Sequence, residues 1–105
     1  MFARVVSAQA QLNKLDEAIE ICQSMEPTWQ QQKGFQGANL LVNRDTGNIL
    51  SISNWATRAD LDATEASGWY QEQVARFSKT WVAPPTREVY EIAVHIGAAR
   101  AAGGA

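Results

Sequence analysis

The chain has 105 residues, of which 46% are hydrophobic, and a formal net charge of -2. This length supports one small domain with a single core, and the scattered basic residues exclude the concentrated positive stripe that nucleic-acid binding requires. Cys22 is the only cysteine, which excludes an internal disulfide and a multi-cysteine metal site and indicates a reducing compartment.

The first predicted elements are a strand and a helix. Residues 2–8 (FARVVSA) are rich in valine and free of breakers, which favours a strand. Asn13, with Asp16 three positions later, predicts the start of a helix. Because Pro27 lies inside the helical pattern, we expect a kink or restart near residues 24–26 and an end at residues 33–34. One apolar face of this helix carries Leu15, Ala18, Ile19, Cys22, Met25 and Trp29.

Residues 34–55 (GFQGANLLVNRDTGNILSISNW) predict a β-hairpin around which the other elements pack. Two alternating, half-apolar runs flank residues 45–48 (DTGN), and the glycine of this short loop tolerates the positive φ that a hairpin turn needs. The two runs therefore predict the second and third strands.

A second helical segment and a last strand follow the hairpin. Thr57, with Asp60 three positions later, predicts a capped helix start, and Ser67 begins another turn or a continuation. Pro84 and Pro85 end this segment, and residues 87–96 (REVYEIAVHI) alternate as a fourth strand. The helical segment presents an aromatic-rich face made of Tyr70, Val74, Phe77 and Trp81.

The element order predicts an α+β, ferredoxin-like βαββαβ fold: a four-stranded antiparallel sheet with the helices on one face. We expect one domain over residues 1–97 and a flexible C-terminal tail over residues 98–105, whose small side chains bury too little area to offset their ordering entropy. The N-terminal residues do not resemble a signal peptide, and no stretch approaches the ~20 apolar residues of a spanning helix. We therefore expect a cytoplasmic protein with no membrane partner.

The predicted strands carry apolar residues on both faces of the sheet. Neighbouring apolar pairs occur in every strand, whereas an antiparallel sheet with one wet face should alternate more cleanly. Leaving the second face in water would cost roughly 25 cal/mol for each Å² of apolar surface. We therefore expect a homodimer through the sheet face. The pairs are Val5 and Val6, Leu40 and Leu41, Ile49 and Leu50, and Val89 and Tyr90.

Three motifs within residues 2–96 resemble those of antibiotic biosynthesis monooxygenase-like domains of the dimeric α+β barrel superfamily. They are residues 34–37 (GFQG), 45–47 (DTG) and 51–55 (SISNW). The resemblance implies a barrel formed by two sheets and a pocket between sheet and helices within each protomer. The family includes cofactor-independent monooxygenases of aromatic polyketides, quinol monooxygenases, haem-degrading oxygenases and proteins with no assigned reaction.

The resemblance also implies site residues. Trp55 matches a tryptophan that recurs in both the polyketide and the haem subgroups, but the asparagine that polyketide enzymes carry four residues earlier is Ser51 here. Asn54 is adjacent to Trp55, although strand alternation sends it to the opposite face unless a bulge intervenes. Haem degraders use a helical histidine, and residues 56–93 contain none, which argues against haem.

Each candidate also has a structural interpretation. Trp55 as a packing anchor is as well supported as Trp55 in a pocket, and aromatic stripes on helices usually form core. Trp69 suits partial exposure or a dimer contact. His95 has no catalytic partner motif and Cys22 lies on the core-facing stripe, so both are better explained as structural. No spacing of acids suggests a metal cluster or a catalytic acid pair.

Two functions follow from the sequence. The first is a monooxygenase without metal or organic cofactor that acts on an aromatic phenol, quinol or polyketide-like substrate, with Trp55, Ser51 and Tyr70 as catalytic candidates and Asn54, Phe77 and Trp81 as substrate-binding candidates. The second is a non-catalytic ligand-binding or structural homodimer of the same fold. A cavity of roughly 300 Å³ or more with converging polar groups would favour the monooxygenase. A filled interior would favour the non-catalytic homodimer.

Overall fold

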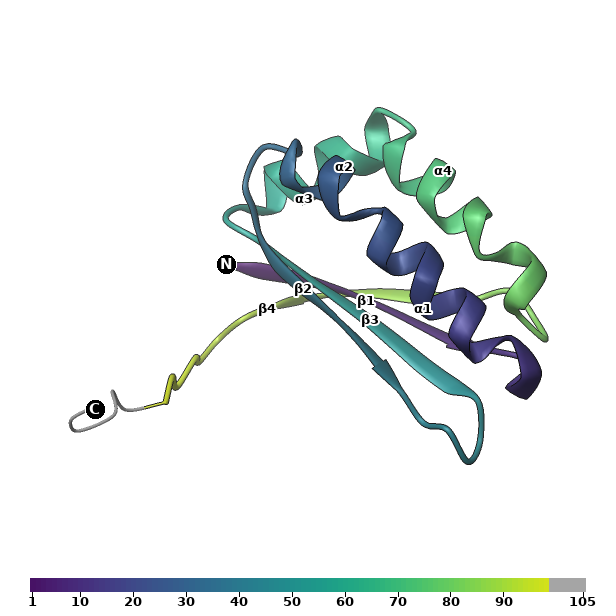
Figure 1. Cartoon of the computed structure of the whole chain (residues 1–105). Helices are drawn as coiled ribbons and strands as arrows, with labels where there is room; N and C mark the ends of the chain where they lie inside the picture. Colours follow the sequence, from purple (N-terminus) through teal and green to yellow (C-terminus); the bar gives the residue numbers. More distant parts are fainter. Residues whose placement is uncertain (99–105) are drawn as a thin grey trace.

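The computed structural model describes residues 1–98, in which all α-helices lie on one face of a four-stranded sheet (Figure 1). The predicted βαββαβ order is confirmed, and each predicted helical segment is divided into two α-helices. No helix in residues 1–98 has the length and hydropathy needed to cross a membrane. The elements in chain order are β1 (Phe2–Gln9), the 3-10 turn η1 (Leu12–Lys14), α1 (Leu15–Ser24), α2 (Glu26–Gln30), β2 (Phe35–Val42), β3 (Asn48–Trp55), α3 (Arg58–Ala66), α4 (Trp69–Arg76), the 3-10 turn η2 (Ser78–Thr80) and β4 (Thr86–Glu91).

The strands pair in the order β2-β3-β1-β4, and every neighbouring pair is antiparallel. This is the ferredoxin-like arrangement expected from the sequence. In the central pair, Phe2 lies opposite Trp55 and Gln9 opposite Asn48. Because residues directly opposite each other share a face, the even-numbered residues of β1 and the odd-numbered residues of β3 point together toward the helices.

The β2–β3 hairpin forms where the sequence predicts it, and its loop geometry explains the glycine. The side-chain oxygen of Asn43 accepts hydrogen bonds from the backbone N–H groups of Asp45 and Thr46, at 3.0 and 3.1 Å. Gly47 has a φ of 83°, and a Cβ there would lie 2.5 Å from the carbonyl oxygen of Ala10. A side chain at this position would therefore both strain the backbone and collide with it.

Two of the predicted helix boundaries are confirmed and two are wrong. The helix breaks at Met25, inside the expected window, with Pro27 in the first turn of α2. The hydroxyl of Thr57 accepts a hydrogen bond from the Asp60 N–H at 3.0 Å, as a capping residue should. Asn13 caps nothing, because it lies within η1 and α1 begins after Lys14. The helical segment also ends at Gln30, before the predicted residues 33–34.

The fourth strand is shorter than the predicted residues 87–96. The β1–β4 register places Phe2 opposite Glu91, and the Ile92 N–H still reaches the carbonyl of Met1 at 2.8 Å. Residues 93–96 run past the end of β1 and have no strand to pair with, so they extend away from the body of the protein (Figure 1). Of the predicted tail over residues 98–105, residues 99–105 lie outside the described part of the chain.

Candidate functional site

A small cavity lies between the helices and the sheet, with a volume of about 50 Å³. Strands β1, β2 and β3 supply its floor, and Met25, α2, α4 and the segment after α4 supply its walls. Most of its lining is apolar or aromatic. The polar residues of the lining are Arg4, Ser51, Ser53, Tyr70 and Gln73.

Four of the six predicted site residues line this cavity and two do not. Ser51 lines it from β3, Tyr70 from α4, and Phe77 and Trp81 from the segment that follows α4. The rings of Phe77 and Trp81 stack with centroids 6.0 Å apart. The helical stripe and the third strand therefore meet at one site, as their spacing in the sequence suggests.

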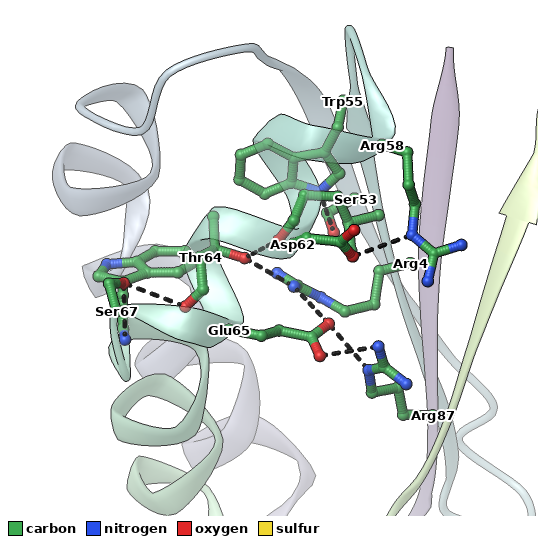
Figure 2. A network of polar contacts seen from close by, with 11 residues as sticks. Arg4, Ser53, Trp55, Arg58, Asp62, Thr64, Glu65, Ser67 and Arg87 are labelled. Atoms are coloured by element: carbon green, nitrogen blue, oxygen red, sulfur yellow. Dashed lines mark hydrogen bonds and ion pairs between the residues drawn. The ribbon is translucent and has the colours of Figure 1, made fainter.

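Trp55 lies behind the cavity wall, fully buried, with 0% exposure. Its indole N–H donates to the hydroxyl of Ser53 at 3.0 Å and so already has a partner (Figure 2). Its ring contacts Phe35 and Trp69 edge-on, with centroids 5.5 and 6.5 Å away. Trp55 thus supports residues of the lining without itself belonging to it.

Asn54 lies on the sheet face opposite the helices. It pairs with Ala3 on one side and Gly37 on the other, out of phase with Ser53 and Trp55. The irregularity in the sheet is in β2, between Phe35 and Gly37, and leaves the alternation of β3 intact. Asn54 therefore does not reach the cavity, and the substrate-binding role predicted for it has no support at this site.

The buried group that dominates the site electrostatically is the guanidinium of Arg4, whose residue is only 2% exposed. Its Nη1 donates to the Thr64 hydroxyl at 2.8 Å and to the Glu65 carboxylate at 3.2 Å (Figure 2). Its Cζ lies 4.2 Å from the ring centroid of Tyr70 and 5.5 Å from that of Trp55. These contacts fix a cation between aromatic faces at the edge of the cavity.

Glu65 serves two guanidinium groups. Besides Arg4, it pairs with Arg87 of β4, whose Nη2 lies 2.7 Å from the second carboxylate oxygen (Figure 2). Burial lowers the pKa of Arg4, and the hydrogen bond and charge of Glu65 partly reverse this. Burial raises the pKa of Tyr70, an effect that the nearby Arg4 charge partly reverses, so the phenol stays neutral at physiological pH. Two cations sharing one carboxylate leave the cluster with a net positive charge.

Three indole N–H groups near the cavity are buried without a hydrogen-bond partner among the described residues. They belong to Trp29, Trp69 and Trp81, all of which line the cavity. A buried donor without a partner costs roughly 1–3 kcal/mol, and native proteins contain few of them. Each of the three nitrogen atoms has almost no accessible surface, so a ligand in the cavity could reach these donors only after the side chains around them move.

A family model described as "Antibiotic biosynthesis monooxygenase" matches residues 1–76, well over half of the chain. The chain belongs to this family. Among curated proteins, none matches its sequence. The family model covers β1 through α4, and therefore includes Arg4, Ser51, Trp55 and Tyr70.

Solved structures of other proteins show the same fold. A monooxygenase from the gene ActVA-Orf6 of Streptomyces coelicolor, in complex with nanaomycin D, superposes with a TM-score of 0.79 at 14% identity, over 93% of this chain and 92% of that one. Rv0793 from Mycobacterium tuberculosis superposes with a TM-score of 0.73 at 14% identity, over 91% of this chain and 98% of that one. NE2512, a protein of unknown function from Nitrosomonas europaea, superposes with a TM-score of 0.72 at 16% identity, over 93% of this chain and 95% of that one.

The sequence analysis of this antibiotic biosynthesis monooxygenase family member does not identify Arg4 as a site residue. The signal was present: in residues 2–8, Arg4 shares the parity of Phe2, Val6 and Ala8, all of which face the helices. A charged residue on the buried parity of a strand requires a partner. That partner, Glu65, lies 61 positions later, so local spacing could not reveal the pair.

Within residues 1–98, no group of three or more His, Cys, Asp or Glu side chains is placed to hold a metal ion. His95 is exposed beyond the end of β4 and does not line the cavity. Cys22 is half-buried on α1, and burial raises the pKa of its thiol. The polar side chains that the described lining does supply are a guanidinium, hydroxyl groups and the Gln73 carboxamide.

Proposed function

We propose that this protein is a cofactor-independent monooxygenase that acts on an aromatic phenol, quinol or polyketide-like substrate. Membership of the family supports the reaction class. The observation that carries the proposal is the buried Arg4 guanidinium, which shares the Glu65 carboxylate with Arg87 and lines an aromatic cavity. Such a charge favours the ionised form of a phenol, since a cation within ~4–6 Å lowers the pKa of an acid by about 1–3 units.

The hydrogen-bonding character of the lining supports the same substrate class. The buried indole N–H groups and the guanidinium can only donate hydrogen bonds, and no aspartate, glutamate or histidine is found among the described residues that line the cavity. Once the side chains of the lining move to expose the indole N–H groups, these donors suit a ligand whose oxygens accept hydrogen bonds. Phenolate and quinone oxygens do so, whereas a cationic ligand would meet repulsion from Arg4.

The proposed reaction needs no group beyond the substrate and molecular oxygen. The phenol releases its proton to water, and the phenolate gives one electron to O₂, forming a phenoxyl radical and superoxide. The two combine at a ring C–H carbon to give a hydroperoxide after protonation. Loss of water then leaves a carbonyl, so that one oxygen atom enters the quinone product and the other leaves as water.

Each residue of the site has a role in this reaction. Arg4 stabilises the phenolate, while the Tyr70 and Ser51 hydroxyls orient it through hydrogen bonds. Phe77 and Trp81 hold the flat rings by stacking. Trp55 positions Arg4 and Ser53 from behind. Positioning of this kind supplies much of the rate enhancement in sites that lack a strong general base.

Oxygen uptake with 1,3-dihydroxynaphthalene or anthrone tests the proposal. We expect substrate-dependent uptake, with Tyr70→Phe lowering kcat/KM by about tenfold, the loss expected for one hydrogen bond to a charged oxygen. The exposed neighbour Gln71 provides the control, because Gln71→Ala should leave the rate unchanged. If the wild-type protein consumes no oxygen with either compound, or if Tyr70→Phe matches it, the proposed roles are wrong.

The size of the cavity favours a second candidate function. A volume of about 50 Å³ is far below the roughly 300 Å³ or more of small-molecule sites. A protein whose interior stays this full would be a non-catalytic ligand-binding or structural dimer. Tight binding of aromatic ligands without oxygen uptake would favour the ligand-binding dimer over the oxygenase. Absence of both ligand binding and oxygen uptake would favour the structural dimer.

We also propose that the protein is a homodimer through the sheet face that carries no helices, as in a dimeric α+β barrel. Leu41, Leu50 and Tyr90 on this face are 48%, 36% and 47% exposed. They surround the central pair of Val5 and Ile52, which lie opposite each other in the register. An apolar surface of this kind on a small domain marks an interaction site, and a two-fold partner presents the same surface in return.

Light scattering should give a mass of about twice the 11.5 kDa of one chain. The double variant Leu41→Lys/Leu50→Lys should reduce the measured mass to that of one chain, because two buried, unpaired charges per protomer would not be tolerated at the interface. Gln71→Lys, on the outer side of α4, is the matched control and should remain dimeric. A wild-type monomer at high concentration would exclude this assembly.

A further inference from the structure

A second hollow lies outside the cavity: a groove of about 410 Å³ between the α1–α2 segment and the edge strand β2. Cys22 and Gln23 line it from α1, and Phe35, Gly37 and Ala38 line it from β2. Glu26, Trp29 and Gln30 of α2 complete its wall. Nothing described so far assigns a role to this groove.

Trp29 lines both the groove and the inner cavity. On the groove side, its ring stacks on Phe35 with centroids 5.8 Å apart and an interplanar angle of 8°. On the cavity side, it contacts Trp69 at a tilt of 53°, with centroids 6.3 Å apart. One side chain therefore separates a cavity too small for an aromatic ligand from a groove large enough for one.

Aromatic packing, and not a side-chain hydrogen bond, holds Trp29 in place among the described residues. Its indole N–H has no hydrogen-bond partner among the described residues, so moving the ring breaks no polar contact within them. It belongs to α2, a helix of five residues that is separated from α1 by the break at Met25. Displacing the ring therefore costs its packing against Phe35 and Trp69 and no side-chain hydrogen bond within the described residues.

We propose that the inner cavity and the groove form one elongated site for a flat, polycyclic aromatic ligand, with Trp29 as a movable wall between them. This inference rests on the proposed function and specifies its substrate. The oxygen-bearing ring would lie inside, beside Arg4, and the remaining rings would lie in the groove against Phe35. With Trp29 displaced, the combined volume exceeds the roughly 300 Å³ that a ligand of this size requires.

The groove also sets the character of the outer part of the ligand. Glu26 is the only charged side chain among the described residues that line the groove, and its carboxylate disfavours a second anionic group at that end. Gln23 and Gln30 offer both donors and acceptors to hydroxyl or carbonyl groups. The site therefore selects a ligand that is acidic at one end and neutral at the other.

Cys22 provides a test that needs neither a mutation nor turnover. It is the only thiol in the chain and lines the groove but not the inner cavity. Because burial raises its pKa, alkylation by iodoacetamide is measured at alkaline pH. With 1,8-dihydroxyanthraquinone at ten times its measured dissociation constant, we expect alkylation to slow about tenfold, since only the unliganded fraction reacts. Bound ligand without protection of Cys22, or no binding, would overturn the proposal.

A matched pair of variants tests the role of Trp29. Trp29→Leu removes the wall, whereas Gln71→Leu changes an exposed position of α4 that lines neither hollow. We expect Trp29→Leu to raise the affinity for 1,8-dihydroxyanthraquinone relative to phenol by at least about fivefold, because the cost of displacing the ring disappears. The same ratio should stay at the wild-type value in Gln71→Leu, and equal ratios in both variants would contradict a dividing wall.

These measurements separate this inference from the proposed oxygenase activity. A protein that binds the anthraquinone and protects Cys22, but consumes no oxygen with anthrone, has the elongated site without the reaction. A protein that consumes oxygen while Cys22 stays reactive under saturating ligand has the reaction without the elongated site. The first result supports the inference and the second overturns it.

Discussion

Replacing Arg4 with methionine is expected to lower the rate of oxygen uptake by at least about a hundredfold. A phenol bound beside the Arg4 guanidinium should have its pKa lowered by about 2 units, within the range for a close opposite charge. At a pH below the pKa of the bound phenol, losing this 2-unit lowering of the pKa reduces the reactive phenolate fraction about a hundredfold, equivalent to roughly 2.7 kcal/mol. Methionine preserves much of the volume of the side chain, so the change acts mainly on charge.

Absorbance titration of bound 1-naphthol measures this effect directly. In the wild-type protein, the naphthol should ionise at lower pH than in water, because the positive cluster favours the anion. In Arg4→Met, ionisation should move to the value in water or above it, since burial alone disfavours the anion. Arg4→Lys keeps the charge but loses the planar stacking and forked hydrogen bonding of arginine, so an intermediate result is expected.

Arg87 tests whether the uncompensated charge is the cause. Arg87→Met leaves Glu65 paired with Arg4 alone, so the cluster becomes neutral and the shift in naphthol pKa should shrink although Arg4 remains. Arg58 pairs with Asp62 on the surface of α3 and serves as the control, with no expected effect (Figure 2). If naphthol ionises at the same pH in the wild-type, Arg4→Met and Arg87→Met proteins, electrostatic stabilisation of the phenolate is excluded.

The fold was predictable from sequence where local chemistry determines the structure. The glycine of the hairpin loop, the Thr57 cap and the break before Pro27 are each set by residues within a few positions of one another. The end of β4 was not predictable in this way. Residues 92–96 keep the alternation of a strand, but whether they pair depends on where β1 begins in the register, which is a long-range property.

The candidate site was predictable only in part, for a related physical reason. Periodicity identifies which residues share a face, and the helical stripe with Tyr70, Phe77 and Trp81 lines one cavity with Ser51, a residue singled out by the family resemblance. It cannot distinguish a residue in the lining from one directly behind it, which is the case of Trp55. Nor can it find a charge pair between β1 and α3, so Arg4 stands out only through its burial and its contact with Glu65 in the fold.

Trp55→Ala is expected to lower the free energy of unfolding by about 3–5 kcal/mol, the usual cost of truncating a buried tryptophan or phenylalanine to alanine. Its ring is fully buried and contacts Phe35, Trp69 and the Arg4 guanidinium, so its loss leaves a void at the junction of β2, β3 and α4. Urea denaturation monitored by far-ultraviolet circular dichroism measures the change. A loss below about 1 kcal/mol, as at exposed sites, would contradict this packing.

Trp55→Phe separates the structural role of this residue from a direct catalytic one. Phenylalanine keeps an aromatic ring beside Arg4 but cannot donate to the Ser53 hydroxyl, so we expect a loss of about 1 kcal/mol of stability for the missing hydrogen bond. Because Trp55 lies outside the lining, KM should stay near the wild-type value and any fall in kcat should follow the shift in the pKa of bound naphthol. A raised KM with an unchanged naphthol pKa would instead mean that Trp55 contacts the substrate in an opened form of the site.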